Sequence, residues 1–157
     1  MNVVMIREVQ SGDYPQWKQL WAGYNAFYDR SGPTALSAEI VDTTWQRFLD
    51  PAEPVHALVA EQRGQLVGLA HYLFHRSTIQ TQFTCYLQDL FTAQQARGAG
   101  IGQKLIIAVY KCAESAGSPK VHWQTHETNV TAMRLYNKVA ERSGFVVYRK
   151  TLGSGET

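Results

Sequence analysis

The sequence has few cysteines, no long hydrophobic run and no strong excess of charge. Its two cysteines, Cys85 and Cys112, are too few for a disulfide scaffold and indicate thiols in a reducing compartment. No apolar run reaches the roughly 20 residues of a membrane-spanning helix, and the N-terminus lacks a signal-peptide pattern. The formal net charge is +2 and basic residues form no long run, which argues against a nucleic-acid tract. We therefore expect a cytoplasmic protein that binds neither membrane nor nucleic acid.

A chain of 157 residues with 45% hydrophobic content can form one domain around one core. We expect this domain to cover residues 1–152, followed by a flexible tail at 153–157. Hydrophobic spacing predicts the order β-α-α-β-β-β-α-β-α-β, hence an α/β (mixed α+β) fold with a mostly antiparallel mixed sheet and helices on both faces. The expected strands are 3–9, 55–61, 66–74, 81–92, 120–125 and 145–150. Three of the expected helices follow Asp13, Ser37 and Asn129, residues placed to cap them, and the fourth covers 101–116.

The stretch from Gln94 to Gly102 contains three glycines and lies between a predicted strand and a predicted helix. Glycine lets a backbone turn without a Cβ clash, so N–H groups of the turn and of the first helical residues can converge on one point. The helix dipole adds partial positive charge at that point. A pyrophosphate group is the ligand that such an arrangement favours.

Spacing alone leaves several interpretations of this loop open. A P-loop would end in Gly-Lys-Ser/Thr, but Gln103 follows Gly102. A dinucleotide fingerprint would read Gly-x-Gly-x-x-Gly early in the chain, whereas Gly98, Gly100 and Gly102 lie late and are evenly spaced. A helix start with turn glycines and no ligand is a third interpretation. Coenzyme A is the fourth, and it depends on the rest of the chain.

The element order and the pattern Gln94-x-x-Arg97-Gly98-x-Gly100-Ile101-Gly102 resemble those of the GCN5-related N-acetyltransferases over nearly the whole chain. Residues 17–28, 47–51 and 135–139 look most similar to the fungal-type histone and polyamine acetyltransferases. The resemblance implies that acetyl-coenzyme A donates an acetyl group to a primary amine by direct attack in a ternary complex. The acceptor would be a polyamine, a lysine-like small amine or a protein lysine. A homodimer or larger homo-oligomer is also implied.

A second segment, from Asn129 to Lys138, is similar to another cofactor segment of that family. Asn129, Ala132 and Tyr136 share one face of a predicted helix, because they are three and seven residues apart. Asn129 could bond a polar pantetheine group, and Ala132 is small enough for a flexible arm to pass. The full set of implied cofactor contacts is Leu90, Phe91, Thr92, Arg97, Gly98, Ala99, Gly100, Ile101, Gly102, Asn129, Ala132, Tyr136 and Lys138.

The resemblance also implies chemical roles. Tyr136 is the candidate to donate a hydrogen bond or a proton to the departing sulfur, and a backbone N–H near 90–92 would polarise the carbonyl. Diamine acetyltransferases carry a glutamate where this chain has Gln88, which cannot accept a proton. The base is therefore open among Asp89, Glu127 through water, and no dedicated base. Gln88 also keeps an alternative open, a non-catalytic acyl-coenzyme A sensor or assembly subunit.

An aromatic stripe at helical spacing precedes these motifs. Such a stripe usually packs in a core, but Tyr24, Tyr28 and Trp45 are candidates to line an acceptor cleft. Asp89 lies in an otherwise apolar strand, where a carboxylate needs a partner, and it could attract the positive charge of the substrate or bridge the backbone. We expect no metal site, because His122 and His126 are four residues apart along an extended chain.

Overall fold

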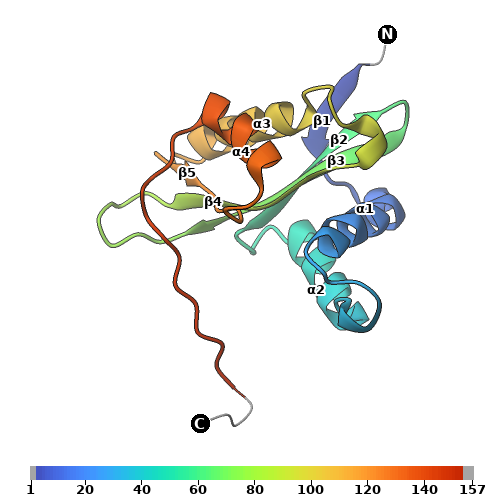
Figure 1. The fold of residues 1–157 in the computed structure, drawn as a ribbon, viewed down its shortest axis with the longest axis horizontal. Coiled ribbons are helices and arrows are strands. Elements are labelled where there is room, and N and C mark those ends of the chain that lie inside the picture. The colour runs from blue at the N-terminus through green and yellow to red at the C-terminus, as the bar shows by residue number, and fades with distance from the viewer. Residues whose placement is uncertain (1–2, 154–157) are drawn as a thin grey trace. The chain divides into compact units, whose positions relative to one another are not determined.

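A computed structural model of the chain describes residues 3–153 and separates it into two units, 1–124 and 125–157 (Figure 1). Each unit is described by itself. Of the predicted tail, Gly153 is the only residue within the described part, and the rest lies outside it. None of the helices in the described range is both long and apolar enough to cross a membrane.

The first unit contains a five-stranded sheet in the order β1-β2-β3-β4-β5. Neighbouring strands from β1 to β4 are antiparallel, and β5 pairs with β4 in parallel. The mixed, mostly antiparallel sheet predicted from the sequence is thus confirmed. The strands are β1 (Val4–Glu8), β2 (Val55–Gln62), β3 (Gln65–His75), β4 (Thr84–Thr92) and β5 (Val121–His122).

A tight hairpin joins β2 to β3, as the turn signal in the sequence predicts. Arg63 and Gly64 both have positive φ, at 52° and 76°, the conformation that a two-residue hairpin turn with the right twist requires. Further along, the pairing of β3 with β4 shifts register, with His71 opposite Asp89 and the next residue of β3 opposite Leu87. Gln88 is therefore the extra residue of a bulge, and bulges re-aim neighbouring side chains.

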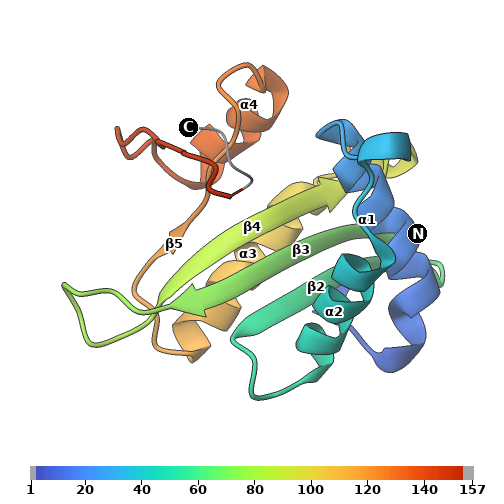
Figure 2. The same cartoon turned by 90° about the horizontal axis from the view of Figure 1, so that it is seen from below.

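Three helices cover the two faces of this sheet. Figures 1 and 2 show α1 (Tyr14–Phe27) and α2 (Ala38–Leu49) on one face and α3 (Ile101–Ser115) on the other. Trp17, Trp21 and Tyr24 of α1 face inward, and Trp17 is fully buried. The cluster on the α1 and α2 face of the sheet consists of Trp17, Leu20, Trp21, Tyr24, Trp45, Val59, Leu66, Leu69 and Ala93.

One of the two helix caps predicted for this unit is confirmed and the other is wrong. The Ser37 hydroxyl accepts a hydrogen bond from the Ile40 amide at 3.3 Å and so caps α2. Asp13 makes no side-chain cap to α1. Its carboxylate accepts two hydrogen bonds from Arg7, at 2.7 and 2.9 Å, and this pairing lowers the pKa of Asp13. Asp13 thereby links β1 to the start of α1.

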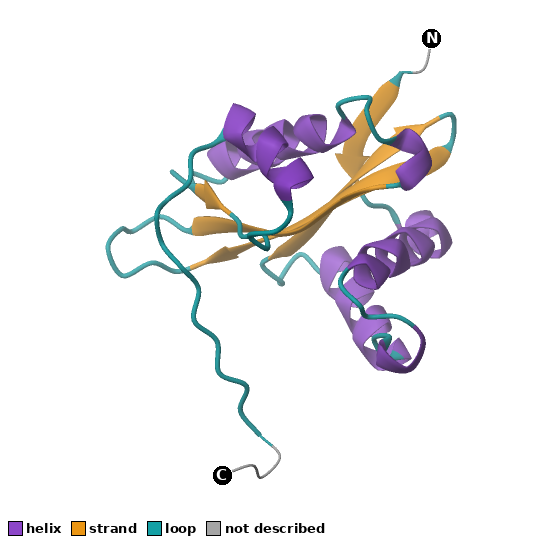
Figure 3. Cartoon of the chain, in the orientation of Figure 1, coloured by secondary structure: helices purple, strands orange, loops and turns teal. Residues whose placement is uncertain are grey.

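Within its described residues, 125–153, the second unit contains one helix, α4 (Val130–Val139), capped by Asn129. The expected strand over 145–150 is wrong, because these residues form no strand (Figure 3). The expected strand at 120–125 shrinks to the two residues of β5. The apolar residues of the C-terminal segment are exposed, Phe145 by 89% and Tyr148 by 93%. A strand needs a hydrogen-bonded neighbour, which β-branched and aromatic side chains alone do not supply.

Candidate active site

The glycine loop connects the end of β4 to the start of α3. Gly98 and Gly100 have φ values of 87° and 75°, in the left-handed region, and Gly100 is the residue that precedes α3. A Cβ built on either glycine would meet no atom within 4 Å, so the space beside the loop is open. The Arg97 side chain holds the loop by donating from Nε to the Thr92 carbonyl at 3.1 Å.

The backbone amides of this loop are available to a ligand. The Arg97 amide donates to the Gln94 carbonyl, and the Lys104 amide donates to the Gly100 carbonyl. Between them, the amides of residues 98–103 donate to no acceptor in the described part of the chain. Because α3 begins here, its partial positive charge adds to these donors, and the arrangement fits a diphosphate.

One edge of β4 is open along the half that leads into this loop. β5 pairs with β4 only at Cys85 and Tyr86. From Leu87 to Thr92, no strand of the described part pairs with that edge. Apart from the Thr92 carbonyl, which Arg97 contacts, backbone groups of residues 90–92 on this edge therefore remain available for hydrogen bonding to a ligand.

Asp89 is held by a buried chain of hydrogen bonds on the α1 side of the sheet. The indole Nε1 of Trp17 donates to Nε2 of His71 at 2.9 Å, and Nδ1 of His71 lies 2.8 Å from an Asp89 oxygen. Because an indole only donates, Nε2 of His71 must carry the lone pair, and Nδ1 carries the proton that Asp89 accepts. His71 and Asp89 are only 3% and 9% exposed. The hydrogen bond from His71, itself fixed by Trp17, therefore orients the carboxylate of Asp89.

Two of the three aromatic residues predicted to line a cleft lie near this carboxylate. Burial and the negative charge of Asp89 raise the pKa of Tyr24, and the positive charge of Arg30 opposes that shift. Tyr28 packs on Tyr24, with ring centroids 5.0 Å apart, and is exposed. The expectation that Trp45 lines the acceptor cleft is wrong. Trp45 is 3% exposed and packs in the core, because α2 presents its apolar side to the sheet.

Comparison with known proteins decides the family. The sequence model of the acetyltransferase (GNAT) family matches residues 15–140. The chain belongs to this family. It is 33% identical over 149 residues to the yeast (Saccharomyces cerevisiae) D-amino-acid N-acetyltransferase HPA3, covering 94% of this chain and 90% of that protein. It is 30% identical to the thialysine N-epsilon-acetyltransferase of Bos taurus over 142 residues, 87% of this chain and 82% of the relative.

Solved structures agree on the fold. The aminoglycoside N-acetyltransferase AAC(6')-Iy, solved with coenzyme A, superposes with a TM-score of 0.81 at 15% identity, and the match covers 96% of both chains. A transcriptional regulator from Bacillus halodurans superposes with a TM-score of 0.82 at 20% identity, over 96% of this chain and all of the other.

The family match and the two curated relatives identify the protein as an acetyl-coenzyme A-dependent N-acetyltransferase, as the resemblance predicted. It transfers acetyl groups to amines.

The segment from Asn129 to Lys138, predicted from the sequence to contact the cofactor, lies in the second unit. Asn129 accepts a hydrogen bond from the Ala132 amide at 3.4 Å and donates one to the Thr125 hydroxyl at 3.3 Å. Its carboxamide therefore caps α4, which is its predicted position in the helix. Ala132 and Tyr136 lie on the half-buried face of α4, whereas Lys138 is exposed. Glu127, in the turn before the helix, is also exposed.

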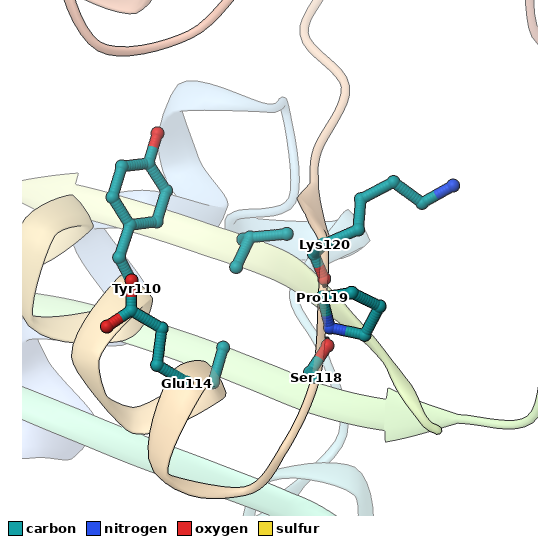
Figure 4. Close-up of a pocket in the computed structure, with 7 residues that line it drawn as sticks. Tyr110, Glu114, Ser118, Pro119 and Lys120 are labelled. Atoms are coloured by element: carbon teal, nitrogen blue, oxygen red, sulfur yellow. Dashed lines mark hydrogen bonds between the residues drawn. The ribbon is translucent and has the colours of Figure 1, made fainter. Parts of the chain in front are cut away.

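Two hollows on the first unit of the acetyltransferase border α3. One, of about 310 Å³, is shown in Figure 4 between Tyr110 and Glu114 of α3 and the segment Ser118–Lys120, far along the helix from the glycine loop. The other, a groove of about 600 Å³, begins at Gly100 and is bordered by Lys104 and Lys111. Lys104, in the first turn of α3, brings positive charge close to the loop, and this charge favours an anionic ligand.

Sequence reasoning missed the histidines that the sheet brings together. His71 was not assigned a partner, although it lies opposite Asp89 in the register of β3 and β4. Nε2 of His75 lies 3.0 Å from Nε2 of His122, and burial lowers the pKa of His122. These contacts depend on strand register, so alternation within one strand could not reveal them.

Proposed function

We propose that this acetyltransferase moves the acetyl group of acetyl-coenzyme A onto the primary amine of a small molecule by direct attack in a ternary complex. The observation that carries the proposal is the run of unpaired amides at residues 98–103 beside the open edge of β4. One stretch of backbone could then bind the diphosphate while the adjoining strand faces the acyl arm. The relatives that act on D-amino acids and on thialysine support a small amine acceptor.

The cofactor supplies an activated thioester, and the chain supplies orientation. The amides of residues 98–102 bind the diphosphate, and Arg97 keeps the loop in shape through its bond to Thr92. Backbone groups of Leu90, Phe91 and Thr92 align the acyl arm, and one N–H polarises its carbonyl. The resemblance also implies cofactor contacts at Asn129, Ala132 and Lys138. Holding both reactants together in this way supplies much of the rate.

The acceptor must lose a proton before it attacks. An alkylammonium with a pKa of about 10.4 is neutral in only about 1 molecule in 2,500 at pH 7, which is equivalent to about 4.6 kcal/mol. Asp89 is already oriented by His71, so we assign it to attract the ammonium group. Proton removal is left to Glu127 through water, or to solvent with no dedicated base.

Tyr136 is assigned to the departing sulfur. The reference pKa of a tyrosine, about 10, exceeds that of a thiol, about 8.5, so full proton transfer in water would be uphill by about 2 kcal/mol. A hydrogen bond from the phenol to the forming thiolate is therefore its main contribution. Tyr136 lies on the face of α4 shared by Asn129 and Ala132, which supports a common role.

Release of free thiol from acetyl-coenzyme A tests the proposal. The purified protein is assayed with D- and L-amino acids, polyamines, lysine analogues and a basic peptide, and products are identified by the mass of one added acetyl group. We expect acceptor-dependent thiol release, and Tyr136→Phe should lower kcat by about 10- to 100-fold with little change in the KM for acetyl-coenzyme A. Binding of the cofactor without transfer to any amine would refute the proposal, and full turnover by Tyr136→Phe would remove the role of that residue.

We also propose that the enzyme is a cytoplasmic homodimer. Cys85 and Cys112 are both free, which suits a reducing compartment. The exposed apolar residues from Phe145 to Tyr148 suit an interface with a second copy.

A further inference from the structure

Arg30 follows α1 and is held in place over two tyrosine rings. Its Nε donates to Oδ1 of Asn25 at 2.9 Å, and Asn25 is only 4% exposed. The Arg30 amide also donates to the Asn25 carbonyl. The guanidinium lies over Tyr24 and Tyr28, with its Cζ 5.8 and 5.4 Å from the two ring centroids. Two anchors therefore fix a side chain that would otherwise be mobile.

The end of the Arg30 guanidinium remains available for a ligand. Within residues 3–153, its two terminal nitrogens make no hydrogen bond to protein, and Arg30 forms no ion pair. A planar guanidinium with two unused nitrogens side by side matches the two oxygens of a carboxylate.

The opposite charge, Asp89, lies near the same phenol. The Tyr24 ring packs on Phe91, with centroids 6.2 Å apart, and Phe91 follows Asp89 by two residues on the same face of β4. The pKa of Tyr24 responds to both groups, because the charge of Asp89 raises it and the charge of Arg30 lowers it. Asp89 accepts a hydrogen bond from His71 and, within residues 3–153, forms no ion pair with Arg30. A negative charge on β4 and a positive charge after α1 thus both lie near the Tyr24 ring.

We infer that Arg30 is the carboxylate anchor of the acceptor site and Asp89 its ammonium anchor, so that the preferred acceptor is a small amino acid. The inference rests on the proposed function. An amino acid carries both complementary charges within one small molecule. A diamine or polyamine would instead bring a second ammonium group toward Arg30, which is repulsive. A lysine within a protein has no free carboxylate near its amine.

Matched acceptors that differ only in the carboxylate test this assignment. Lysine is compared with cadaverine, and alanine, as its D- and L-forms, with ethylamine, each by kcat/KM for thiol release. We expect the wild-type enzyme to prefer at least one amino acid to its decarboxylated counterpart by about tenfold or more, as one charged hydrogen-bonded pair would give. Equal or better use of the counterparts in both pairs would overturn the inference.

Arg30→Gln removes the charge and keeps a polar side chain. It should lower kcat/KM for the amino acid about tenfold or more and change that of the counterpart less than about twofold, and Arg30→Lys should restore part of the loss. The exposed Arg47, changed to Gln, is the matched control and should alter neither value. Equal losses for both acceptors, or unfolding of both Arg30 variants, would show a structural role and overturn the inference. If the wild type acetylates no amine at all, the proposed function itself fails.

Discussion

Nδ1 of His71 lies 2.8 Å from the carboxylate of Asp89, and both side chains are buried between α1 and the sheet. Trp17 fixes the tautomer of His71 by donating to its other nitrogen. The bulge at Gln88 places Asp89 opposite His71 rather than one residue out of register. An oriented carboxylate that already accepts a hydrogen bond is better suited to hold a cation than to shuttle a proton.

Asp89→Asn separates these two roles. The amide oxygen can still accept the proton of His71, so the fold should be retained, but the negative charge is lost. We expect the KM for a cationic acceptor to rise about tenfold or more, with the KM for acetyl-coenzyme A unchanged. The acidic limb of the pH dependence of kcat/KM should stay in place. Loss of that limb would identify Asp89 as the base, and the exposed Glu39, changed to Gln, is the control.

The glycine loop could be predicted because its signal is local. A strand, closely spaced glycines and an amphipathic helix follow one another between Tyr86 and Ser115, and no distant contact is needed to recognise them. The helix caps at Ser37 and Asn129 were likewise local. Asp13 shows the limit, because its carboxylate pairs with Arg7 of β1 rather than with α1.

What could not be predicted depends on partners far along the chain. A buried carboxylate at Asp89 was expected to need a partner, but His71 becomes that partner only through the bulged register of β3 and β4. Trp45 has the same aromatic character as the cleft residues, and only packing places it in the core. The segment 145–150 is rich in the β-branched and aromatic residues that strands favour, yet strand pairing cannot be deduced from composition.

Gly100→Ala tests the conformation of the cofactor loop. Gly100 has a φ of 75°, and alanine in that left-handed conformation costs about 1–2 kcal/mol. We expect a loss of unfolding free energy of about 1 kcal/mol in urea denaturation and a higher KM for acetyl-coenzyme A, because the amides 98–103 would shift. Gly12→Ala is the matched control, since Gly12 also has open space around it but lacks a positive φ. Equal effects of the two changes would contradict the assignment.

His56 should make stability depend on pH. It stacks on Tyr72, with ring centroids 5.2 Å apart, and burial lowers its pKa, opposed by the charge of Glu8. The unfolded chain therefore binds the proton at a higher pH than the folded protein does. The contribution of the neutral His56 ring to the free energy of unfolding is complete above the ordinary histidine pKa of about 6.5, and it is lost as the pH falls below that value. Urea unfolding from about pH 8 to pH 5 should show a shallower decline for His56→Gln than for the wild type. An unchanged decline would refute this, and the exposed His126, changed to Gln, is the control.

The apolar C-terminal segment predicts that the enzyme associates. Phe145 and Tyr148 are 89% and 93% exposed, and Val146 and Val147 between them are 74% and 68% exposed. Contiguous exposed apolar residues of this kind mark interaction surfaces. Because most oligomers of soluble proteins are symmetric homodimers, we expect the partner to be a second copy of the chain. Light scattering coupled to size-exclusion chromatography should therefore give the mass of a dimer for the wild type and of a monomer for Phe145→Asp combined with Tyr148→Asp. Replacing the exposed polar residues Glu141 and Arg142 by alanine is the control and should leave the dimer intact. A wild-type protein that stays monomeric at high concentration would show that these side chains serve another purpose.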